Sequence, residues 1–448
     1  MRKILSTLLI FFLTLPCFIS DNVVFANTLP EITAPFGVLM DYETGQILYN
    51  KNGEQRVFPA STTKAWTAYV VIKNVEDLSE RVLIESLEPV EGTSMYLQNG
   101  ESFTIKELLQ GLMITSANDA AVVLARHISG SDAEFAKLMT DEAKAIGATG
   151  TNFNNPHGLP DDIHYTTPID MALMSRQAMN NDIFREIVKT ESVRFPKSET
   201  CFTERYFTNT NKLLTSQEQT TYKNQVVNMK YDIVDGIKTG YTNAAGRCLL
   251  SSAIKDNRRM IATVFKAEGD NVFLDSRTLL DYGFDNFESK LIVNKDSYDE
   301  NLKISFSKEK FLNYKPKYSY KVVVPINSGN GEYTVKEELF DVDLPITKNQ
   351  VVGKLDIYNG DELEHTVDLI STGPVNSIFA FMDGALINIL KVVAFLFVAL
   401  LITGLSIRHY NLSKRKKRRN SNVINYNFKR GNTGLFSKKN NNNNRRKK

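Results

Sequence analysis

Cysteine is scarce in this chain: Cys17, Cys201 and Cys248 are the only three among 448 residues. So few cysteines cannot form a disulfide framework for a protein of this size. Cys17 lies in an N-terminal apolar segment that we expect to be removed, for the reasons given below. We therefore expect Cys201 and Cys248 to remain as two separate thiols that pack like small apolar side chains.

Acidic residues are absent from the C-terminal segment 408–448, which carries 15 lysines and arginines. Because the whole chain has a formal charge of only +3 and residues 1–26 contribute +1, residues 27–407 carry −13. An acidic body with a basic tail does not suggest a nucleic-acid enzyme, so we expect no nucleic-acid partner. The composition, 42% apolar and 23% charged, is that of an ordinary globular protein with room for two or three domains.

Residues 1–26 have the three parts of a secretory signal peptide. Arg2 and Lys3 precede an apolar run at 4–18, and Ala26 ends the segment. The apolar run is short for a membrane span. We expect cleavage after Ala26, which predicts that the protein is exported.

A second apolar run lies near the C-terminus, where residues 378–407 are predicted to form an anchor helix that contains Lys391. The long side chain of Lys391 can extend toward the interface, so the run is long enough to cross a bilayer. The basic residues 414–419 that follow are typical of the cytoplasmic side. We predict a single-pass protein of the cell membrane with its body outside and a basic, disordered cytoplasmic tail, 408–448, that contacts anionic lipid. An interfacial helix and a buried core helix are the alternatives.

Between the two ends, the chain changes character once. Residues 27–290 combine a predicted hairpin at 36–49, several helical segments and antiparallel strands between 225 and 266. This pattern predicts an α/β domain with an antiparallel sheet. Residues 291–372 contain short alternating strands, the first expected at 303–306, and no cluster of titratable side chains. We expect a small all-β domain that acts as a spacer or docking module.

The sequence Ser61-Thr-Thr-Lys64 opens an apolar helical segment. Positions three apart share one face of a helix, so the Ser61 hydroxyl would lie beside the Lys64 amine. Burial lowers the pKa of a lysine, which would make Lys64 a base for Ser61. The spacing alone is weak evidence, because a surface helix start gives the same string. The same pattern recurs at Ser252, Ser305, Ser307 and Ser413.

Two further motifs make the pattern specific. Ser116-Ala-Asn118 lies in a predicted turn between helices, and Lys238-Thr-Gly240 lies on a predicted strand. The second triplet occurs only once in the chain. In this order, and on a helix, a turn and a strand, the three motifs are the set found in penicillin-binding proteins and β-lactamases.

With these motifs, the sequence resembles the D-alanyl-D-alanine carboxypeptidases of serine peptidase family S11, the low-molecular-mass penicillin-binding proteins. The resemblance covers about residues 30–290 and includes the stretches 155–160, 164–167 and 209–214. It implies a β-lactamase/DD-peptidase-like α/β domain whose antiparallel sheet has helices on both faces. A small all-β domain and a membrane attachment, here a C-terminal transmembrane helix, are expected to follow.

The resemblance also implies catalytic roles. Ser61 would attack the carbonyl between two D-alanines and form an acyl-enzyme, while Lys64 takes its proton. Ser116 would relay a proton to the leaving D-alanine, and Asn118 would hold the substrate amide and Lys64. The expected substrate is a peptidoglycan stem pentapeptide, β-lactams are the expected inhibitors, and no cofactor is expected.

Substrate binding is implied for the strand that carries the third motif. Lys238 and Thr239 would bind the terminal carboxylate of the substrate, and Gly240 would leave room for the substrate along the strand edge. The backbone N–H groups of Ser61 and Tyr241 would form the oxyanion hole.

One feature departs from the family. An arginine often assists the carboxylate after the strand that ends here near Phe265, and the sequence 271–274 offers none. Arg258 and Arg259 lie in a predicted hairpin turn, and we do not assign the role to either.

The other polar candidates have plainer interpretations. His157 and His164 lack the spacing of a metal site, so no metal is expected. Asp170 and Asn211 are interpreted as structural residues.

Two other functions remain possible at this point. A β-lactamase needs a base that deacylates the enzyme rapidly, often a glutamate in an E-x-x-L-N string, and this sequence has none. A catalytically silent protein that binds the cell wall or senses β-lactams is the non-enzymatic alternative, and three intact motifs argue against it.

Overall fold

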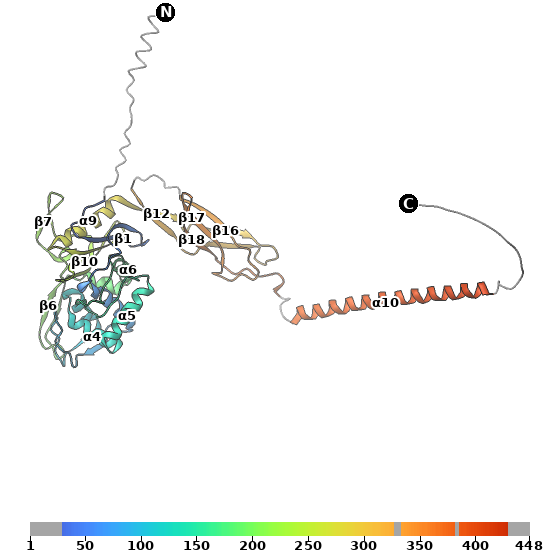
Figure 1. Ribbon diagram of the computed structural model, residues 1–448, viewed down its shortest axis with the longest axis horizontal. Helices are drawn as coiled ribbons and strands as arrows, with labels where there is room; N and C mark the ends of the chain where they lie inside the picture. Colours follow the sequence, from blue (N-terminus) through green and yellow to red (C-terminus); the bar gives the residue numbers. More distant parts are fainter. Residues whose placement is uncertain (1–28, 327–332, 381–384, 429–448) are drawn as a thin grey trace, which may run out of the picture. The chain divides into compact units, whose positions relative to one another are not determined.

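The computed structural model describes residues 29–326, 333–380 and 385–428, so the predicted signal peptide lies outside the described residues. The chain divides into two compact units, and Figure 1 labels several of their helices and strands. The first unit comprises Met1–Val293 and Ser319–Tyr333, and the second comprises Asn294–Tyr318 and Thr334–Lys448.

A five-stranded antiparallel sheet, in the order β2-β1-β11-β10-β9, forms the centre of the first unit. The predicted N-terminal hairpin is confirmed as β1 (Phe36–Asp41) and β2 (Ile47–Lys51). The other three strands follow one another as a meander: β9 (Val234–Thr242), β10 (Gly246–Lys255) and β11 (Arg258–Ala267). Strand β9 is therefore at the edge of the sheet, where a peptide can pair with its backbone.

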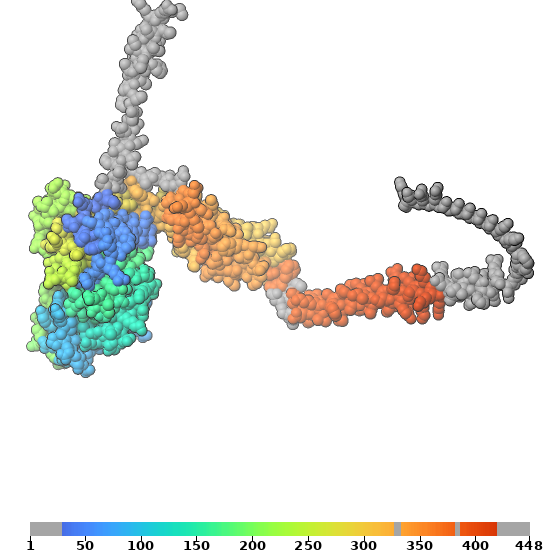
Figure 2. All heavy atoms as spheres, in the orientation of Figure 1, coloured from blue at the N-terminus to red at the C-terminus, as the bar shows by residue number. Residues whose placement is uncertain are grey.

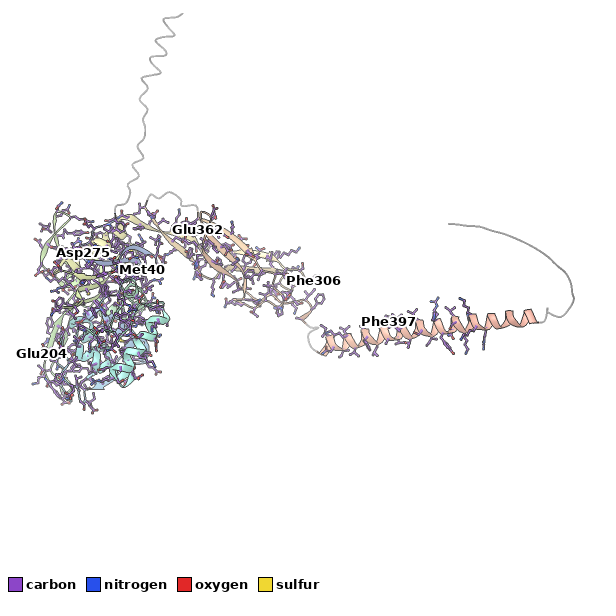
Figure 3. All side chains as sticks on the ribbon, in the orientation of Figure 1. Met40, Glu204, Asp275, Phe306, Glu362 and Phe397 are labelled. Carbon is purple, nitrogen blue, oxygen red and sulfur yellow. The ribbon has the colours of Figure 1, made fainter. Side chains whose placement is uncertain are left out.

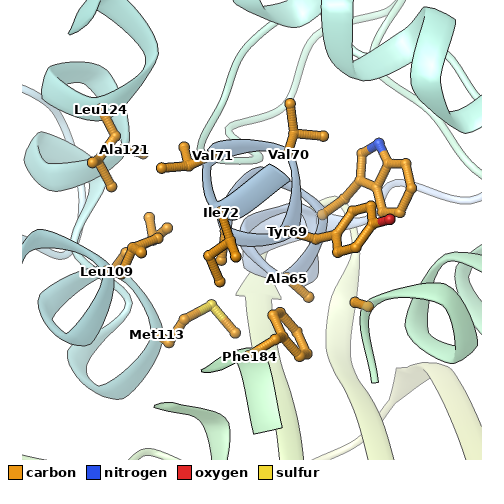
Figure 4. Packing of buried hydrophobic residues seen from close by; sticks show 14 of the residues in the cluster. Ala65, Tyr69, Val70, Val71, Ile72, Leu109, Met113, Ala121, Leu124 and Phe184 are labelled. Atoms are coloured by element: carbon orange, nitrogen blue, oxygen red, sulfur yellow. The ribbon is translucent and has the colours of Figure 1, made fainter. Parts of the chain in front are cut away.

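Helix α2 (Thr63–Asn74) lies at the centre of the helical layer on one face of this sheet, and Thr63 through Ile72 are all buried. A helix that is buried all round must have neighbours on every side. Figure 4 shows its apolar side chains packed among Leu109, Met113, Ala121, Leu124 and Phe184. The other elements of this layer are η1 (Ala60–Thr62), α3 (Ile105–Gln110), η2 (Gly111–Thr115), α4 (Asn118–Ser129), α5 (Asp132–Ala145), α6 (Pro168–Ala178) and α7 (Asp182–Lys189).

The opposite face of the sheet is covered by α9 (Asn271–Asn286), which packs Leu279 and other apolar side chains against residues such as Val264. Asp275 of α9, labelled in Figure 3, accepts a hydrogen bond from the backbone N–H of Thr33 at 2.9 Å. This bond attaches the start of the described chain to the helix. The prediction of helices on both faces of an antiparallel sheet is confirmed.

The remaining elements of the first unit are short. They form the two-stranded sheets β3-β4, β5-β6, β7-β8 and β12-β15, together with one short helix. Their bounds are β3 (Arg81–Leu83), β4 (Ser102–Thr104), β5 (Ser192–Phe195), β6 (Arg205–Thr208), α8 (Lys212–Thr215), β7 (Gln219–Tyr222), β8 (Gln225–Asn228), β12 (Phe287–Val293) and β15 (Tyr320–Pro325).

The second unit contains another five-stranded sheet, in the order β13-β14-β18-β17-β16, as an all-β domain requires. The expected strand at 303–306 is wrong. Strand β13 ends at Lys303, because the Ser307 hydroxyl donates to the carbonyl of Ile304 at 2.9 Å and closes a turn. The bounds are β13 (Glu300–Lys303), β14 (Phe311–Pro316), β16 (Tyr333–Leu339), β17 (Val351–Asn359) and β18 (Glu362–Ser371).

Helix α10 (Ala385–Phe428) contains most of the predicted anchor 378–407, and its segment Leu386–Arg418 is apolar and long enough to cross a membrane. The predicted start is wrong, because residues 378–380 form a turn in which Ser377 accepts hydrogen bonds from the N–H groups of Phe379 and Ala380. The side chains of 386–418 are uncovered in Figure 2, and Phe397 is 65% exposed. The helix also contradicts part of the disordered-tail prediction, since residues 408–428 are helical. Lysine and arginine are good helix formers, and no proline or glycine interrupts 405–430. The end of the tail, 429–448, lies outside the described residues.

A buried ion pair fixes the loop that precedes β4. Arg205 Nη2 lies 2.8 Å from Glu101 Oε2, and the two side chains are only 5% and 0% exposed. The same guanidinium donates to the backbone carbonyls of Met95 and Tyr96 at 2.7 and 2.6 Å. One side chain therefore ties β6 to the loop at 95–101.

We predict that Arg205→Leu destabilises the protein by about 3–5 kcal/mol, because it leaves the Glu101 carboxylate buried without its cation. The double variant Arg205→Leu/Glu101→Leu should recover part of this loss, because neither charge is then buried. Urea unfolding measures both free energies. A double variant no more stable than the single one would contradict this account of the pair.

Candidate active site

Ser61 and Lys64 lie where η1 runs into α2, with Thr62 at the N-cap of the helix. Lys64 Nζ donates a hydrogen bond to Ser61 Oγ at 2.8 Å and another to the backbone carbonyl of His157 at 2.7 Å. The structure thus brings together the hydroxyl and the amine. The N-terminus of the helix beside them favours negative charge.

Lys64 is completely buried. Burial, followed by the nearby Lys238, lowers its pKa well below the usual value, while Asp119 acts in the opposite direction. A lysine held neutral in this way can accept a proton, which an ordinary protonated lysine cannot do. Lys64 therefore has the properties of a general base directed at Ser61.

A close backbone contact holds the turn that carries Ser61. Ala60 has a φ of 48°, and Gly158 approaches it with a φ of 92°. A Cβ atom on Gly158 would lie 1.8 Å from the Ala60 carbonyl oxygen, so only glycine fits at this position. The contact also places the carbonyl of the preceding residue, His157, where Lys64 donates to it.

Ser116 and Asn118 lie at the predicted turn, between η2 and α4, and both of these elements pack on α2. Ser116 is in the left-handed conformation, with a φ of 68°. Ser116 Oγ and Asn118 Oδ1 are buried and have no hydrogen-bond partner among the described residues. Buried polar atoms normally have partners, so two exceptions in one motif are typical of a ligand-binding site.

Asp119, a residue of the stretch 116–121 to which no role was assigned from the sequence, organises the segment that orients Asn118. Its carboxylate accepts hydrogen bonds from Ser94 Oγ at 2.6 Å and from the backbone N–H groups of Met95 and Leu97 at 3.0 Å each. The same segment provides the Glu91 carbonyl, to which Asn118 Nδ2 donates at 2.6 Å. With its amide nitrogen held, Asn118 leaves Oδ1 as its free acceptor.

Strand β9 carries Lys238, Thr239, Gly240 and Tyr241 along the edge of the sheet. A Cβ atom on Gly240 would lie 3.1 Å from the backbone nitrogen of Ser61, so a glycine lets the strand pass directly beside this turn. The first and third motifs therefore meet in one place. Tyr241, the next residue, is 57% exposed.

Lys238 is buried, and burial lowers its pKa to about 7. Its Nζ donates to the carbonyl of Thr239 at 3.1 Å. The Thr239 hydroxyl lies 2.5 Å from that of Thr210, which sequence analysis did not single out. An amine, a hydroxyl and a strand edge form a site suited to a carboxylate at the end of a peptide.

The two candidate histidines have structural partners. His164 accepts a hydrogen bond at Nδ1 from the N–H of Asn154, so its Nε2–H donates to Thr63 Oγ1, with both distances 3.0 Å. Burial lowers the pKa of His164 to about 4 and that of His157 to about 3, so both rings are neutral. In the described part of the chain, no group of three or more possible ligands could hold a metal ion.

The other side chains interpreted as structural also have local partners. Asp170 Oδ2 accepts from the Thr151 hydroxyl at 2.6 Å, and Asn211 caps α8 by accepting from the N–H of Leu213 at 3.1 Å. Cys201 and Cys248 are separate, buried thiols, as expected.

The two arginines of the β10–β11 hairpin are bound elsewhere. Arg259 pairs with Asp235 at 2.7 Å, and Arg258 lies 3.5 Å from Asp41. Arg247, which sequence analysis did not consider, lies opposite Tyr241 on β10. The pairing of Arg247 with Tyr241 depends on the register of β9 and β10, which cannot be read from the sequence alone.

We predict that Lys238→Met raises the stability of the protein at pH 7 by about 1 kcal/mol or more, because it removes a buried amine that the unfolded chain leaves protonated. The lowered pKa means that the folded state binds fewer protons than the unfolded state between pH 7 and the usual lysine value of 10.5. The stability of the wild type should therefore rise with pH in this window, and the advantage of the variant should shrink.

Thermal unfolding at pH 7 and pH 10 measures this difference. Lys212→Met is the matched control, since Lys212 pairs with Asp270 and Glu218 and its pKa is raised. The control should give no stabilisation at either pH. An advantage of Lys238→Met that is equal at both pH values would contradict the role assigned to burial.

Comparison with known proteins agrees with this geometry. The D-alanyl-D-alanine carboxypeptidase family of serine peptidases matches residues 23–269, and the C-terminal domain of penicillin-binding protein 5 matches residues 287–377. D-alanyl-D-alanine carboxypeptidase DacF of Bacillus subtilis is 32% identical, and the alignment covers 79% of this chain and 90% of that protein. DacA of Haemophilus influenzae is 30% identical, with 75% and 84% covered.

Solved structures show the same relationship. Penicillin-binding protein 5 from Haemophilus influenzae superposes with a TM-score of 0.65 at 28% identity, covering 78% of this chain and 99% of that one. Penicillin-binding protein 6B from Escherichia coli gives a TM-score of 0.59 at 27% identity, with 78% and 98% covered. The predicted fold class is confirmed. The chain belongs to the D-alanyl-D-alanine carboxypeptidase family of serine peptidases, and it is an enzyme of the penicillin-binding-protein type.

Proposed function

We propose that Ser61 is the nucleophile with which this carboxypeptidase removes the terminal D-alanine from peptidoglycan stem pentapeptides. The observation that supports this assignment best is the 2.8 Å hydrogen bond between Lys64 Nζ and Ser61 Oγ, made by a completely buried lysine. Further support comes from Gly240, which passes beside Ser61, from Lys238, whose proximity lowers the pKa of Lys64, and from the packing of η2 and α4 against α2.

In the acylation step, Ser61 Oγ attacks the carbonyl between the two D-alanines, and Lys64 takes the hydroxyl proton. The backbone N–H groups of Ser61 and Tyr241 stabilise the oxyanion that forms. Ser116 relays this proton from Lys64 to the nitrogen of the departing D-alanine as the peptide bond breaks, which leaves Lys64 neutral again. The products are free D-alanine and an ester between Ser61 and the shortened peptide.

In the deacylation step, a water molecule attacks this ester, and Lys64 again takes the proton. The bond to Ser61 Oγ breaks, Lys64 returns the proton to Ser61 Oγ, and the shortened peptide leaves with a new C-terminal carboxyl group. Asn118 holds the peptide amide through both steps, because its unpartnered Oδ1 can accept a hydrogen bond from the substrate. A β-lactam acylates Ser61 by the same first step, which accounts for inhibition by this class of compound.

Recognition of the free C-terminus is assigned to β9. Lys238 and Thr239 bind the terminal carboxylate, and Gly240 allows the peptide to lie along the strand edge beside Ser61. The enzyme therefore acts at the end of a peptide.

The N-terminal segment 1–26 and the C-terminal helix α10 support a proposal for the location of the enzyme. We infer that residues 1–26 are removed after Ala26, that the catalytic domain comprises 27–290, and that 291–372 forms the β domain. Helix α10 would cross the cell membrane once, between Ala385 and residue 407, with the catalytic domain outside and the basic segment 408–448 inside. The exposed apolar segment Leu386–Arg418 supports the anchor.

We predict that the full-length protein in detergent releases D-alanine from a stem pentapeptide and that Ser61→Ala lowers this rate by at least 1,000-fold, because it removes the nucleophile. The matched control is Ser305→Ala, which changes an exposed serine in the same S-x-x-K spacing and should leave the rate unchanged. Equal rates for Ser61→Ala and the wild type would refute the assignment.

The same assay separates the alternatives. A β-lactamase would turn over a penicillin rapidly, whereas we expect the labelled acyl-enzyme to persist. A silent binding protein would be labelled by penicillin but would release no D-alanine.

A further inference from the structure

Strand register places Arg247, on β10, on the same face of the sheet as Thr239 of the edge strand β9. Residues two apart on a strand point to the same face, so Thr239 and Tyr241 share one face of β9. Arg247 is the antiparallel partner of Tyr241, and cross-strand partners also share a face. Arg247 is therefore the diagonal neighbour of Thr239, at a Cα separation of about 7–8 Å, within reach of a long side chain.

The guanidinium of Arg247 is available at this position. The residue is exposed, and its Cζ lies 5.5 Å from the centre of the Tyr241 ring, over which it stacks. In the part of the chain that the structure describes, no carboxylate pairs with Arg247, whereas Arg258, Arg259 and Lys212 each have an acidic partner. The ring of Tyr241 holds the cation at the strand edge.

A permanently charged group beside Thr239 would complement Lys238 in binding a carboxylate. Burial lowers the pKa of Lys238 to about 7, so near neutral pH this amine carries only part of a positive charge in the free enzyme. Arginine keeps its charge at every relevant pH, and its planar group can donate two parallel hydrogen bonds to a carboxylate. The usual family arginine after β11 is not available here, since Asn271 and Val272 follow at the start of α9.

We propose that Arg247 binds the free carboxylate of the terminal D-alanine together with Thr239, and that it takes the place of the missing family arginine. This inference rests on the proposed function, because it assigns one more residue to the same substrate end. Arg247 would act on binding and specificity, since it approaches the carboxylate and not the scissile bond.

The test compares Arg247→Gln with the wild type on two peptides that differ only in the terminal carboxylate or carboxamide. On the free acid, kcat/KM should fall by roughly 10- to 100-fold, mainly through KM, because a charged hydrogen bond is lost. On the amide, the two enzymes should agree within about twofold. Arg247→Lys should recover part of the loss, because it restores charge without the planar group.

Arg126→Gln is the control for loss of a surface arginine, since Arg126 pairs with Asp132 at 3.0 Å near the far end of α4. It should behave as the wild type. The rate at which a labelled penicillin and its methyl ester acylate Ser61 gives a second readout, which should show the Arg247→Gln effect only for the free acid.

The outcomes distinguish this inference from the proposed function. A wild type that releases no D-alanine would contradict the proposed function itself. An active wild type with an unchanged Arg247→Gln variant, or with equal losses on the acid and the amide, would overturn the role of Arg247 alone. If Arg247→Gln does not fold, the same comparison is made with Arg247→Lys, for which equal losses on both peptides would likewise overturn the proposal.

Discussion

The chemistry that we propose for this protein depends on keeping one amine out of water beside one hydroxyl. Lys64 is completely buried within the helical layer, yet its Nζ lies 2.8 Å from Ser61 Oγ. Desolvation disfavours the ammonium form, so the surrounding apolar core turns a common surface residue into a base. The packing of α2 on all sides thus has two effects, since it stabilises the fold and sets the proton affinity of its own lysine.

Other backbone segments of the first unit lie close to Ser61 and Lys64. Gly158 and Gly240 permit close approach from two directions, one against Ala60 and the other against Ser61. The loop held by Asp119 and by the Arg205–Glu101 pair orients Asn118. These supports are buried and fully bonded, whereas the groups they position, such as Ser116 Oγ, have no partner among the described residues. In a preorganised site, the supporting side chains make their hydrogen bonds within the protein, whereas the groups that bind substrate keep theirs available.

Local patterns predicted the features that depend on local spacing. The contact between Ser61 and Lys64 follows from positions three apart on a helix, and the hairpin at β1 and β2 follows from alternation around a turn. The approach of Gly240 to Ser61, 179 positions earlier, depends on the whole topology, so only the resemblance to a known family indicated it. No role was assigned to Asp119 or Arg247 from the sequence, because their partners are set by a loop and by a strand register. The helix at 408–428 was missed because its charge was taken as a sign of disorder, although its residues favour helix.

The state of the two thiols also affects how the protein can be produced. Cys201 and Cys248 are both buried and unpaired, so the catalytic domain does not need an oxidant or a disulfide isomerase to reach its native state. Its folding should proceed equally well in reducing and oxidising compartments, unlike that of many secreted proteins. Burial also raises the pKa of the Cys248 thiol to about 12, which keeps it unreactive toward peroxide and electrophiles at neutral pH.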